Sequence, residues 1–231
     1  MMQPTWKAAV AELIGTFALV FMGAGSILAD AMTGGRVGIT GIALAHGLAI
    51  ATMVSATGHV SGGHLNPAVT AAFVATGRMP AGTGATYALA QLAGASLAAF
   101  FLTAAFPETV RTAAALGTPA LAAGLSPGTG IIVEAILTFF LVFAVFGTAV
   151  DARGPRAAGG LFIGLVITMD ILAGGALTGA AMNPARAFGP ALFAGAWANQ
   201  AVYWVGPLLG GVLAGWIYTG VLGPAGDVEG R

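Results

Sequence analysis

Six long apolar segments dominate this chain of 231 residues. Each holds about 20 residues, the length of helix needed to cross about 30 Å of hydrocarbon. Lipid offers the backbone no hydrogen-bond partner, so we expect each segment to satisfy its own backbone as a helix. The sequence therefore predicts an all-α membrane protein with six transmembrane helices, at about residues 8–29, 36–57, 82–106, 129–150, 157–176 and 200–222.

Composition supports this prediction. Hydrophobic residues make up 58% of the chain and charged residues 7%, whereas a soluble domain is about 25% charged. Eight basic and eight acidic residues cancel, so nothing indicates a nucleic-acid partner or an acidic substrate. The chain has no cysteine, which excludes disulfides, thiolate metal ligands and a cysteine nucleophile. We expect a protein embedded in the lipid bilayer, with no nucleic-acid partner and no cofactor.

The triplet Asn-Pro-Ala occurs twice, and each copy opens a shorter apolar segment. These segments, at about 67–77 and 184–194, hold only about ten residues and cannot cross a bilayer alone. Asparagine suits the N-cap position of a helix, and proline suits its first turn. The sequence predicts two re-entrant half-helices, which start at Asn66-Pro67-Ala68 and Asn183-Pro184-Ala185.

The two halves of the chain repeat. Glu12 corresponds to Glu134 (134 − 12 = 122) and Asn66 to Asn183 (183 − 66 = 117). Each repeat unit crosses the membrane three times, which is an odd number. Its second copy must therefore enter the membrane from the opposite side, which makes an inverted repeat. We expect a single channel domain over residues 1–231, with repeat halves at about 8–106 and 129–222, in which the two half-helices meet.

Basic residues predict the orientation through the positive-inside rule. With a cytoplasmic N-terminus, five of them fall inside and two outside; the inner ones are Lys7, Arg78, Arg153, Arg156 and Arg231, and the outer ones are Arg36 and Arg111. We expect a multi-pass protein of the cell membrane with both termini in the cytoplasm. The longest connection, at about 107–129, is expected to lie on one surface.

Two glutamates lie at matching positions within predicted spans, where an ionised side chain costs about 2.5–3.5 kcal/mol. A re-entrant loop has backbone N–H groups without helical partners. We therefore interpret Glu12 and Glu134 as buried acceptors that brace the two loops. The alternative is a proton relay or a coupling-ion site, because paired acids also occur along transport pathways.

The meeting point of the half-helices predicts the chemistry of a pore. Each helix N-terminus carries about half a positive charge, so two facing ends repel cations. The side-chain amides of Asn66 and Asn183 are expected to be free to donate to the oxygen of a passing water, which prevents that water from relaying protons. Asn-Pro as a simple turn initiator explains one triplet, but not two at matching positions.

The motifs resemble the aquaporin (major intrinsic protein) family. The resemblance rests on Ser61-Gly62-Gly63-His64-Leu65-Asn66-Pro67-Ala68-Val69-Thr70, on Met182-Asn183-Pro184-Ala185-Arg186, and on Glu-x-x-x-Thr in the first and fourth spans, and it covers about 8–222. It implies a six-span channel with two half-helices, assembled as a homotetramer with one pore in each subunit. It also implies that His64 touches the cytoplasmic side of the pore, where we expect its ring to bond the loop backbone.

The resemblance further implies a narrow selectivity filter made by His46, Ile171, Ala180 and Arg186. This combination resembles tonoplast-type intrinsic proteins, which conduct water and, in several cases, ammonia and hydrogen peroxide. Arg186 supplies fixed donors and a positive charge, whereas Ile171 and Ala180 are apolar. A wider and half-apolar filter suits ammonia. Glycerol facilitators carry Asp after the arginine, but Ala187 stands here, so glycerol is the weaker alternative.

Asp170 departs from the family pattern. One hypothesis is that it lies near the filter and favours protonation of His46, which would make permeability depend on pH. The alternative is that Asp170 faces an interface or a neighbouring helix, because adjacent helical residues point about 100° apart and Ile171 already faces the pore.

Three other functions are weaker. A secondary transporter also has inverted repeats and broken helices, but it needs a coupling-ion site. An enzyme using Ser61 and His64 would lack a carboxylate to orient the histidine. A metal site made by His46, His59 and His64 has the wrong spacing, so we expect no metal.

Overall fold

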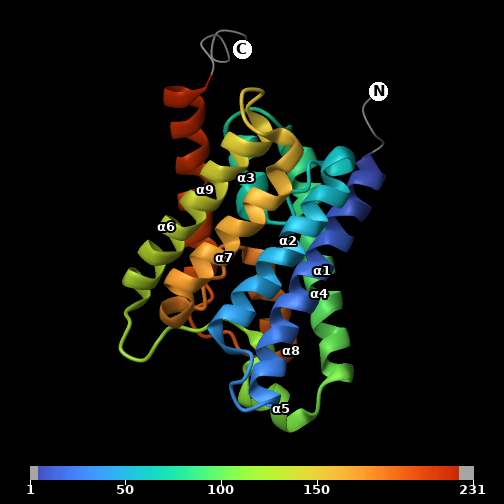
Figure 1. Ribbon diagram of the computed structural model, residues 1–231, viewed down its shortest axis with the longest axis vertical. Coiled ribbons are helices and arrows are strands. Elements are labelled where there is room, and N and C mark those ends of the chain that lie inside the picture. Colours follow the sequence, from blue (N-terminus) through green and yellow to red (C-terminus); the bar gives the residue numbers. More distant parts are fainter. Residues whose placement is uncertain (1–4, 224–231) are drawn as a thin grey trace.

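A computed structural model describes residues 5–223, and every regular element in that range is a helix (Figure 1). Six of the helices are long and apolar enough to cross a membrane, which confirms the predicted spans. Their bounds are α1 Thr5–Met32, α2 Gly38–Ser61, α4 Ala81–Ala105, α6 Pro127–Val145, α7 Gly159–Thr178 and α9 Val202–Ile217. Single turns at Phe146–Val150 (η2), Arg156–Ala158 (η3) and Tyr218–Leu222 (η4) extend α6, α7 and α9.

The two half-helices are α3, Pro67–Ala75, and α8, Pro184–Ala194. The side-chain oxygen of Asn66 accepts from the backbone N–H of Ala68 at 2.8 Å. Asn183 accepts in the same way from Ala185 at 3.0 Å and from Arg186 at 3.2 Å. Each triplet therefore caps a helix with an asparagine and starts it with a proline. In Figure 1, α3 lies in the upper half of the molecule and α8 in the lower half.

The spans that precede the half-helices end alike. Gly62 follows α2 with φ = 90°, and Gly179 follows α7 with φ = 82°. Both donate their backbone N–H back to the preceding turn. Glycine adopts this left-handed conformation without a steric penalty. Each span thus stops at a defined residue and releases a short loop into the interior.

Small residues let the spans pack closely, with α6 against α9, α2 against α7, and α1 against α4. A Cβ atom on Gly210 would collide with the backbone of Ala135, and one on Gly164 with the backbone of Gly47. Lipid provides little hydrophobic drive for helices to associate, so close backbone contact supplies much of the attraction. Gly210 belongs to a group of glycines in α9 that pack against α6 and α3; the others are Gly206, Gly211 and Gly215.

The long connection does not stay on the surface, and the prediction was wrong on this point. It forms α5, Glu108–Ala113, and a single turn η1, Ala115–Gly117. Leu116 and Gly117 are buried in the interior, and Ala122 donates its backbone N–H to Leu177 at 2.8 Å. A composition rich in Ala, Pro and Gly gave no sign of this path, whose cause is described below.

The predicted polar tail from Pro224, together with Arg231, lies outside the described residues. The start of α1 and the end of η4 lie at the same end of the molecule, at the top of Figure 1. The connection between α4 and α6 lies at the opposite end, where α5 is labelled.

Candidate functional site

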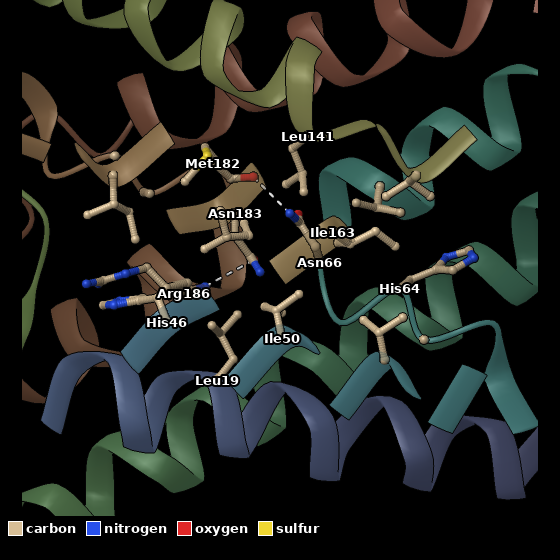
Figure 2. Close-up of a pocket in the computed structure, with 18 residues that line it drawn as sticks. Leu19, His46, Ile50, His64, Asn66, Leu141, Ile163, Met182, Asn183 and Arg186 are labelled. Atoms are coloured by element: carbon tan, nitrogen blue, oxygen red, sulfur yellow. Dashed lines mark hydrogen bonds between the residues drawn. The ribbon is translucent and has the colours of Figure 1, made fainter. Parts of the chain in front are cut away.

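A narrow cavity runs between the two half-helices and holds about 450 Å³ of empty space (Figure 2). Most of its lining is apolar, and these residues are Leu19, Ile50, Val54, Val69, Leu141, Val145, Ile163, Ile167 and Ile171. The polar lining residues are His46, His64, Asn66, Asn183 and Arg186, with the loop residues Gly63, Ala180, Ala181 and Met182. The cavity therefore brings together both asparagines and all four residues of the expected filter.

Glu12 holds the first re-entrant loop. The Oε1 atom accepts from the Ser61 hydroxyl at 2.7 Å and from the His64 N–H at 2.9 Å. The Oε2 atom accepts from the Leu65 N–H at 2.6 Å and from the Gln91 amide at 2.7 Å. The carboxylate is fully buried, and four donors compensate for its loss of water.

Glu134 holds the second loop through three bonds that match those of Glu12, without a counterpart among the described residues to the Gln91 bond. Its Oε1 accepts from the Thr178 hydroxyl at 2.6 Å and from the Ala181 N–H at 2.9 Å, and its Oε2 accepts from the Met182 N–H at 2.7 Å. Tyrosines support both loops: Tyr87 donates to the Ser61 carbonyl at 2.8 Å, and Tyr203 to the Thr178 carbonyl at 2.9 Å. The bonds repeat, which favours the bracing role over a relay.

The threonines that share a helix face with these glutamates make no hydrogen bond to the glutamate carboxylates. Thr16 Oγ1 has no hydrogen-bond partner among the described residues. Thr138 Oγ1 donates to the Glu134 backbone carbonyl at 2.7 Å instead of to the carboxylate.

The backbone just before each triplet is strained. Leu65 and Met182 both have φ = 51°, a conformation that is uncommon in residues with a side chain. Both are almost fully buried, and both donate their N–H to a glutamate. The strained turn positions their carbonyl groups for the contact between the two loops.

The two asparagines meet the opposite loops at the middle of the cavity (Figure 2). Asn66 Nδ2 donates to the Met182 carbonyl at 2.8 Å, and Asn183 Nδ2 donates to the Leu65 carbonyl at 2.9 Å. The expectation of fully free amides was therefore wrong. An NH₂ group has two hydrogens, so one ties the loops together and one remains for the cavity.

Arg186 and His46 lie side by side at one end of the cavity (Figure 2). Arg186 is 2% exposed, and its Nη1 donates to the Gly117 carbonyl at 2.9 Å. The His46 Nδ1 lies 2.9 Å from the Ile42 carbonyl, which makes Nδ1 the donor and leaves Nε2 as an acceptor. Nε2 has no protein partner among the described residues.

The buried path of the long connection follows from Arg186. A buried guanidinium needs acceptors, and Gly117 has φ = 75°, which turns a bare backbone toward the arginine. A Cβ atom on Gly117 would lie 2.8 Å from the Cβ of Ala24. Sequence reasoning missed Gly117 because a single glycine among alanines has no distinguishing pattern.

His64 lies at the other end of the cavity (Figure 2). Its Nδ1 is 3.1 Å from the Thr70 hydroxyl, so the ring contacts a side chain rather than the loop backbone, and that prediction was wrong. Its ring also packs on Phe73, with centroids 4.2 Å apart. A wider hollow shares His64 and Gly63 with the cavity and opens it toward this end.

Asp170 is buried but makes no hydrogen bond within the described residues to His46, and its Oδ2 atom has no partner there. The hypothesis that links Asp170 to His46 therefore has no direct contact to support it.

Comparisons with known proteins agree with this architecture. The family described as "Major intrinsic protein" matches residues 2–218. The chain belongs to the major intrinsic protein family. Proteins of this aquaporin family are membrane channels, and the chain is accordingly a passive water channel and not an enzyme.

Among similar relatives of this family member, aquaporin TIP4-4 of Zea mays is 50% identical over 96% of the chain and 89% of the relative. Aquaporin TIP4-1 of Arabidopsis thaliana is 47% identical over 94% of the chain and 86% of the relative. The crystal structure of the aquaglyceroporin from Plasmodium falciparum has a TM-score of 0.81 and 23% identity, with 95% of the chain and 97% of that structure covered. At this identity the structure supports the aquaporin fold alone.

Proposed function

We propose that the protein conducts water in single file, together with ammonia and hydrogen peroxide, and excludes protons and ions. One observation carries this proposal: the Asn66 and Asn183 amides meet midway along a mostly apolar cavity that ends at a buried arginine. The second amide hydrogen of each asparagine donates to the oxygen of the central water. That water then has no free lone pair toward its neighbours, so a proton cannot pass along the file.

Backbone carbonyls complete the path on either side of the centre. Gly63, His64, Ala180 and Ala181 line the cavity, and their carbonyl groups accept no hydrogen bond from the described residues. These oxygens can accept from waters entering and leaving the centre. The apolar lining residues offer no competing partner, so each water keeps only a few hydrogen bonds and moves on.

The filter residues determine which solutes enter. Arg186 repels cations and donates to solute oxygens. Ile171 and Ala180 leave the rest of the constriction apolar and comparatively wide, which suits ammonia. The residue after Arg186 is the fully buried Ala187, which provides no carboxylate for glycerol, so the glycerol facilitator remains the weaker alternative.

The oligomeric state of the channel and its orientation in the membrane are also proposals. We infer a single domain that functions in the cell membrane as a homotetramer, with the termini in the cytoplasm. Basic residues near the end that carries the start of α1 support this orientation, because Lys7 lies in α1 and Arg153 donates to the Leu222 carbonyl at 2.6 Å. The mass of the detergent-extracted particle tests the tetramer, and a protease site placed at the C-terminus tests the orientation.

Stopped-flow assays on proteoliposomes test the solute preference. Water efflux and ammonia uptake are measured for the wild type, Arg186→Ala and His46→Phe, with Arg36→Ala as a control at an exposed position that does not line the cavity. We expect Arg186→Ala to raise the ammonia-to-water ratio, because it widens the filter. His46→Phe removes a polar ring atom worth about 1 kcal/mol, so the ratio should fall about fivefold.

An unchanged ratio in His46→Phe would show that the filter lies elsewhere. Water flux that saturates, or that requires a gradient of H⁺ or Na⁺, would show that the protein is a secondary transporter and not a channel.

A further inference from the structure

A polar recess lies outside the pore, at the end of the molecule opposite the start of α1. It is an open hollow of about 850 Å³ between the end of α4, α5, η1 and the end of α8. Its polar lining residues are Thr103, Glu108, Arg111 and Thr112, and Phe193 closes one side. None of these residues lines the pore cavity. In Figure 1 this region surrounds the label α5.

Arg111 lines this recess, and its side chain is not fully paired within the described part of the protein. Its Nε atom is buried and has no partner among the described residues. Glu108 lies one turn earlier on α5, yet the pair makes no salt bridge within residues 5–223. A guanidinium donates through a planar fork that matches the oxygens of a phosphate. The recess therefore presents a guanidinium that can donate hydrogen bonds to a phosphate and, one helical turn away, a carboxylate.

The depth of the recess places it at the lipid headgroups. Helix α4 ends at Ala105, and α5 begins at Glu108, directly after the end of a membrane span. An aromatic surface continues from the recess along the span: Phe193 and Phe100 are 42% and 50% exposed, and their ring centroids are 6.0 Å apart. Exposed rings of this kind suit contact with acyl chains.

We propose that this recess binds a phospholipid whose headgroup carries a phosphate and a primary amine, as in phosphatidylethanolamine. The phosphate binds the Arg111 guanidinium, the ammonium group binds the Glu108 carboxylate, and the acyl chains lie on Phe193 and Phe100. One positive and one negative side chain match a zwitterionic headgroup better than an anionic one. A primary amine has three N–H donors for the carboxylate, whereas a quaternary amine has none.

Native mass spectrometry of the full chain in detergent tests the proposal. The protein is titrated with dioleoyl phosphatidylethanolamine, phosphatidylcholine and phosphatidylglycerol, and the retained lipid is compared among the wild type, Arg111→Gln and Glu108→Gln. Arg36→Gln is the matched control, because it removes an exposed charge expected on the same side of the membrane. Thermal unfolding of each variant verifies that it is folded.

We expect the wild type to retain the ethanolamine lipid most strongly. Arg111→Gln removes a charge-assisted bond to phosphate and should weaken retention about tenfold. Glu108→Gln should abolish the preference for ethanolamine over choline, while Arg36→Gln should change neither quantity.

Three results would overturn the proposal. The first is a wild type that does not distinguish the three lipids or that prefers phosphatidylglycerol. The second is an effect of Arg36→Gln equal to that of Arg111→Gln. The third is displacement of the bound lipid by free phosphoethanolamine at equal concentration, which would show that the recess takes a soluble headgroup rather than a membrane lipid.

Discussion

His46 and Gly23 fit one another at the arginine end of the pore. The histidine ring fills the space that a side chain at position 23 would need, and a Cβ atom there would collide with Nε2 and Cδ2 of His46. The Nδ1 atom is fixed by the Ile42 carbonyl, so the ring can respond only by tilting into the cavity. The width of the cavity beside His46 therefore depends on a glycine in a neighbouring helix.

Gly23→Ala should narrow the filter and lower water permeability several-fold without unfolding the protein. Gly25→Ala is the matched control, because its Cβ would lie at an ordinary 3.5 Å from Leu102. Both changes raise helix propensity by the same amount, about 1 kcal/mol. A difference in water permeability between the two variants therefore reports on the displacement of the His46 ring. Stopped-flow water efflux at equal protein density measures it. Equal permeability of the two variants would contradict the proposed coupling.

At the scale of single elements, the half-helices depend on buried carboxylates. Glu134 accepts from one hydroxyl and two backbone N–H groups of the second loop. A glutamine of the same shape has only one oxygen, and its NH₂ group would face a donor. At least one buried donor then has no partner, which costs about 1–3 kcal/mol.

Glu134→Gln should therefore lower the thermal unfolding temperature by several degrees, at about 2–4 °C per kcal/mol for a chain of this size. Glu12→Gln should do the same, while the exposed Glu108→Gln should not. Tryptophan fluorescence during heating of the detergent-solubilised protein gives the comparison. If Glu134→Gln keeps the wild-type unfolding temperature but abolishes a proton flux that the wild type carries, the carboxylate acts as a relay and not as a brace.

How far the sequence predicts these elements depends on whether a residue's partner is local. The half-helix starts follow from Asn66 and Asn183, because capping involves neighbours two or three residues away. The acceptor role of Glu12 also follows, because a carboxylate in lipid requires donors. The Gly117 carbonyl, the Thr70 hydroxyl beside His64 and the cross-loop use of the asparagine amides are contacts between distant segments. No spacing in the sequence indicates them.

A second group of bonds joins the end of α6 to the end of α9. Asp151 accepts from the Arg153 side chain and from the Tyr218 hydroxyl, the latter at 3.1 Å, and Arg153 donates to the Leu222 carbonyl at 2.6 Å. The Arg153 guanidinium and its backbone N–H hold the pKa of the Asp151 carboxyl below its ordinary value, which is about 3.9. The charged form is thus favoured by folding.

This shift predicts how stability depends on pH. Because the folded pKa is depressed, the stabilisation is complete well above pH 3.9 and is lost as pH falls through the folded value. Asp151→Asn should unfold at a lower temperature than the wild type at pH 7, and the gap should narrow progressively below about pH 4. Melting curves at pH 7, 5, 4 and 3 test this. If the difference in unfolding temperature between the wild type and Asp151→Asn stays constant from pH 7 to pH 3, the stabilisation comes from packing rather than from the charge of Asp151.

At the scale of the whole molecule, the pore centre is nearly symmetric but its two ends are not. Leu65 corresponds to Met182 and Val69 to Arg186, each at an offset of 117 (182 − 65 = 117; 186 − 69 = 117). Both Val69 and Arg186 line the cavity. The duplicated frame therefore builds the loops and the central amides twice, while a single unmatched residue, Arg186, adds a buried positive charge at one end.

The symmetric centre should form a barrier to cations that is independent of Arg186. Two facing helix N-termini contribute about half a positive charge each, so one carboxylate at the centre would cancel their sum. Asn66→Asp supplies that charge and keeps the cap on α3, because Asp is as good an N-cap as Asn. It loses the amide bond to Met182 and places a carboxylate oxygen against that carbonyl, which costs more than the roughly 1 kcal/mol of an ordinary hydrogen bond. The bonds from the loop to Glu12 remain.

We therefore expect Asn66→Asp to remain folded, to conduct water more slowly, and to leak protons and small cations about tenfold faster than the wild type. A pH-sensitive dye inside proteoliposomes, with a potential set by potassium and valinomycin, measures the leak. Asn199→Asp adds the same charge at an exposed turn and should leak no more than the wild type. A folded Asn66→Asp that stays proton-tight would place the whole barrier at Arg186, and the facing helix ends would then serve only to position the amides.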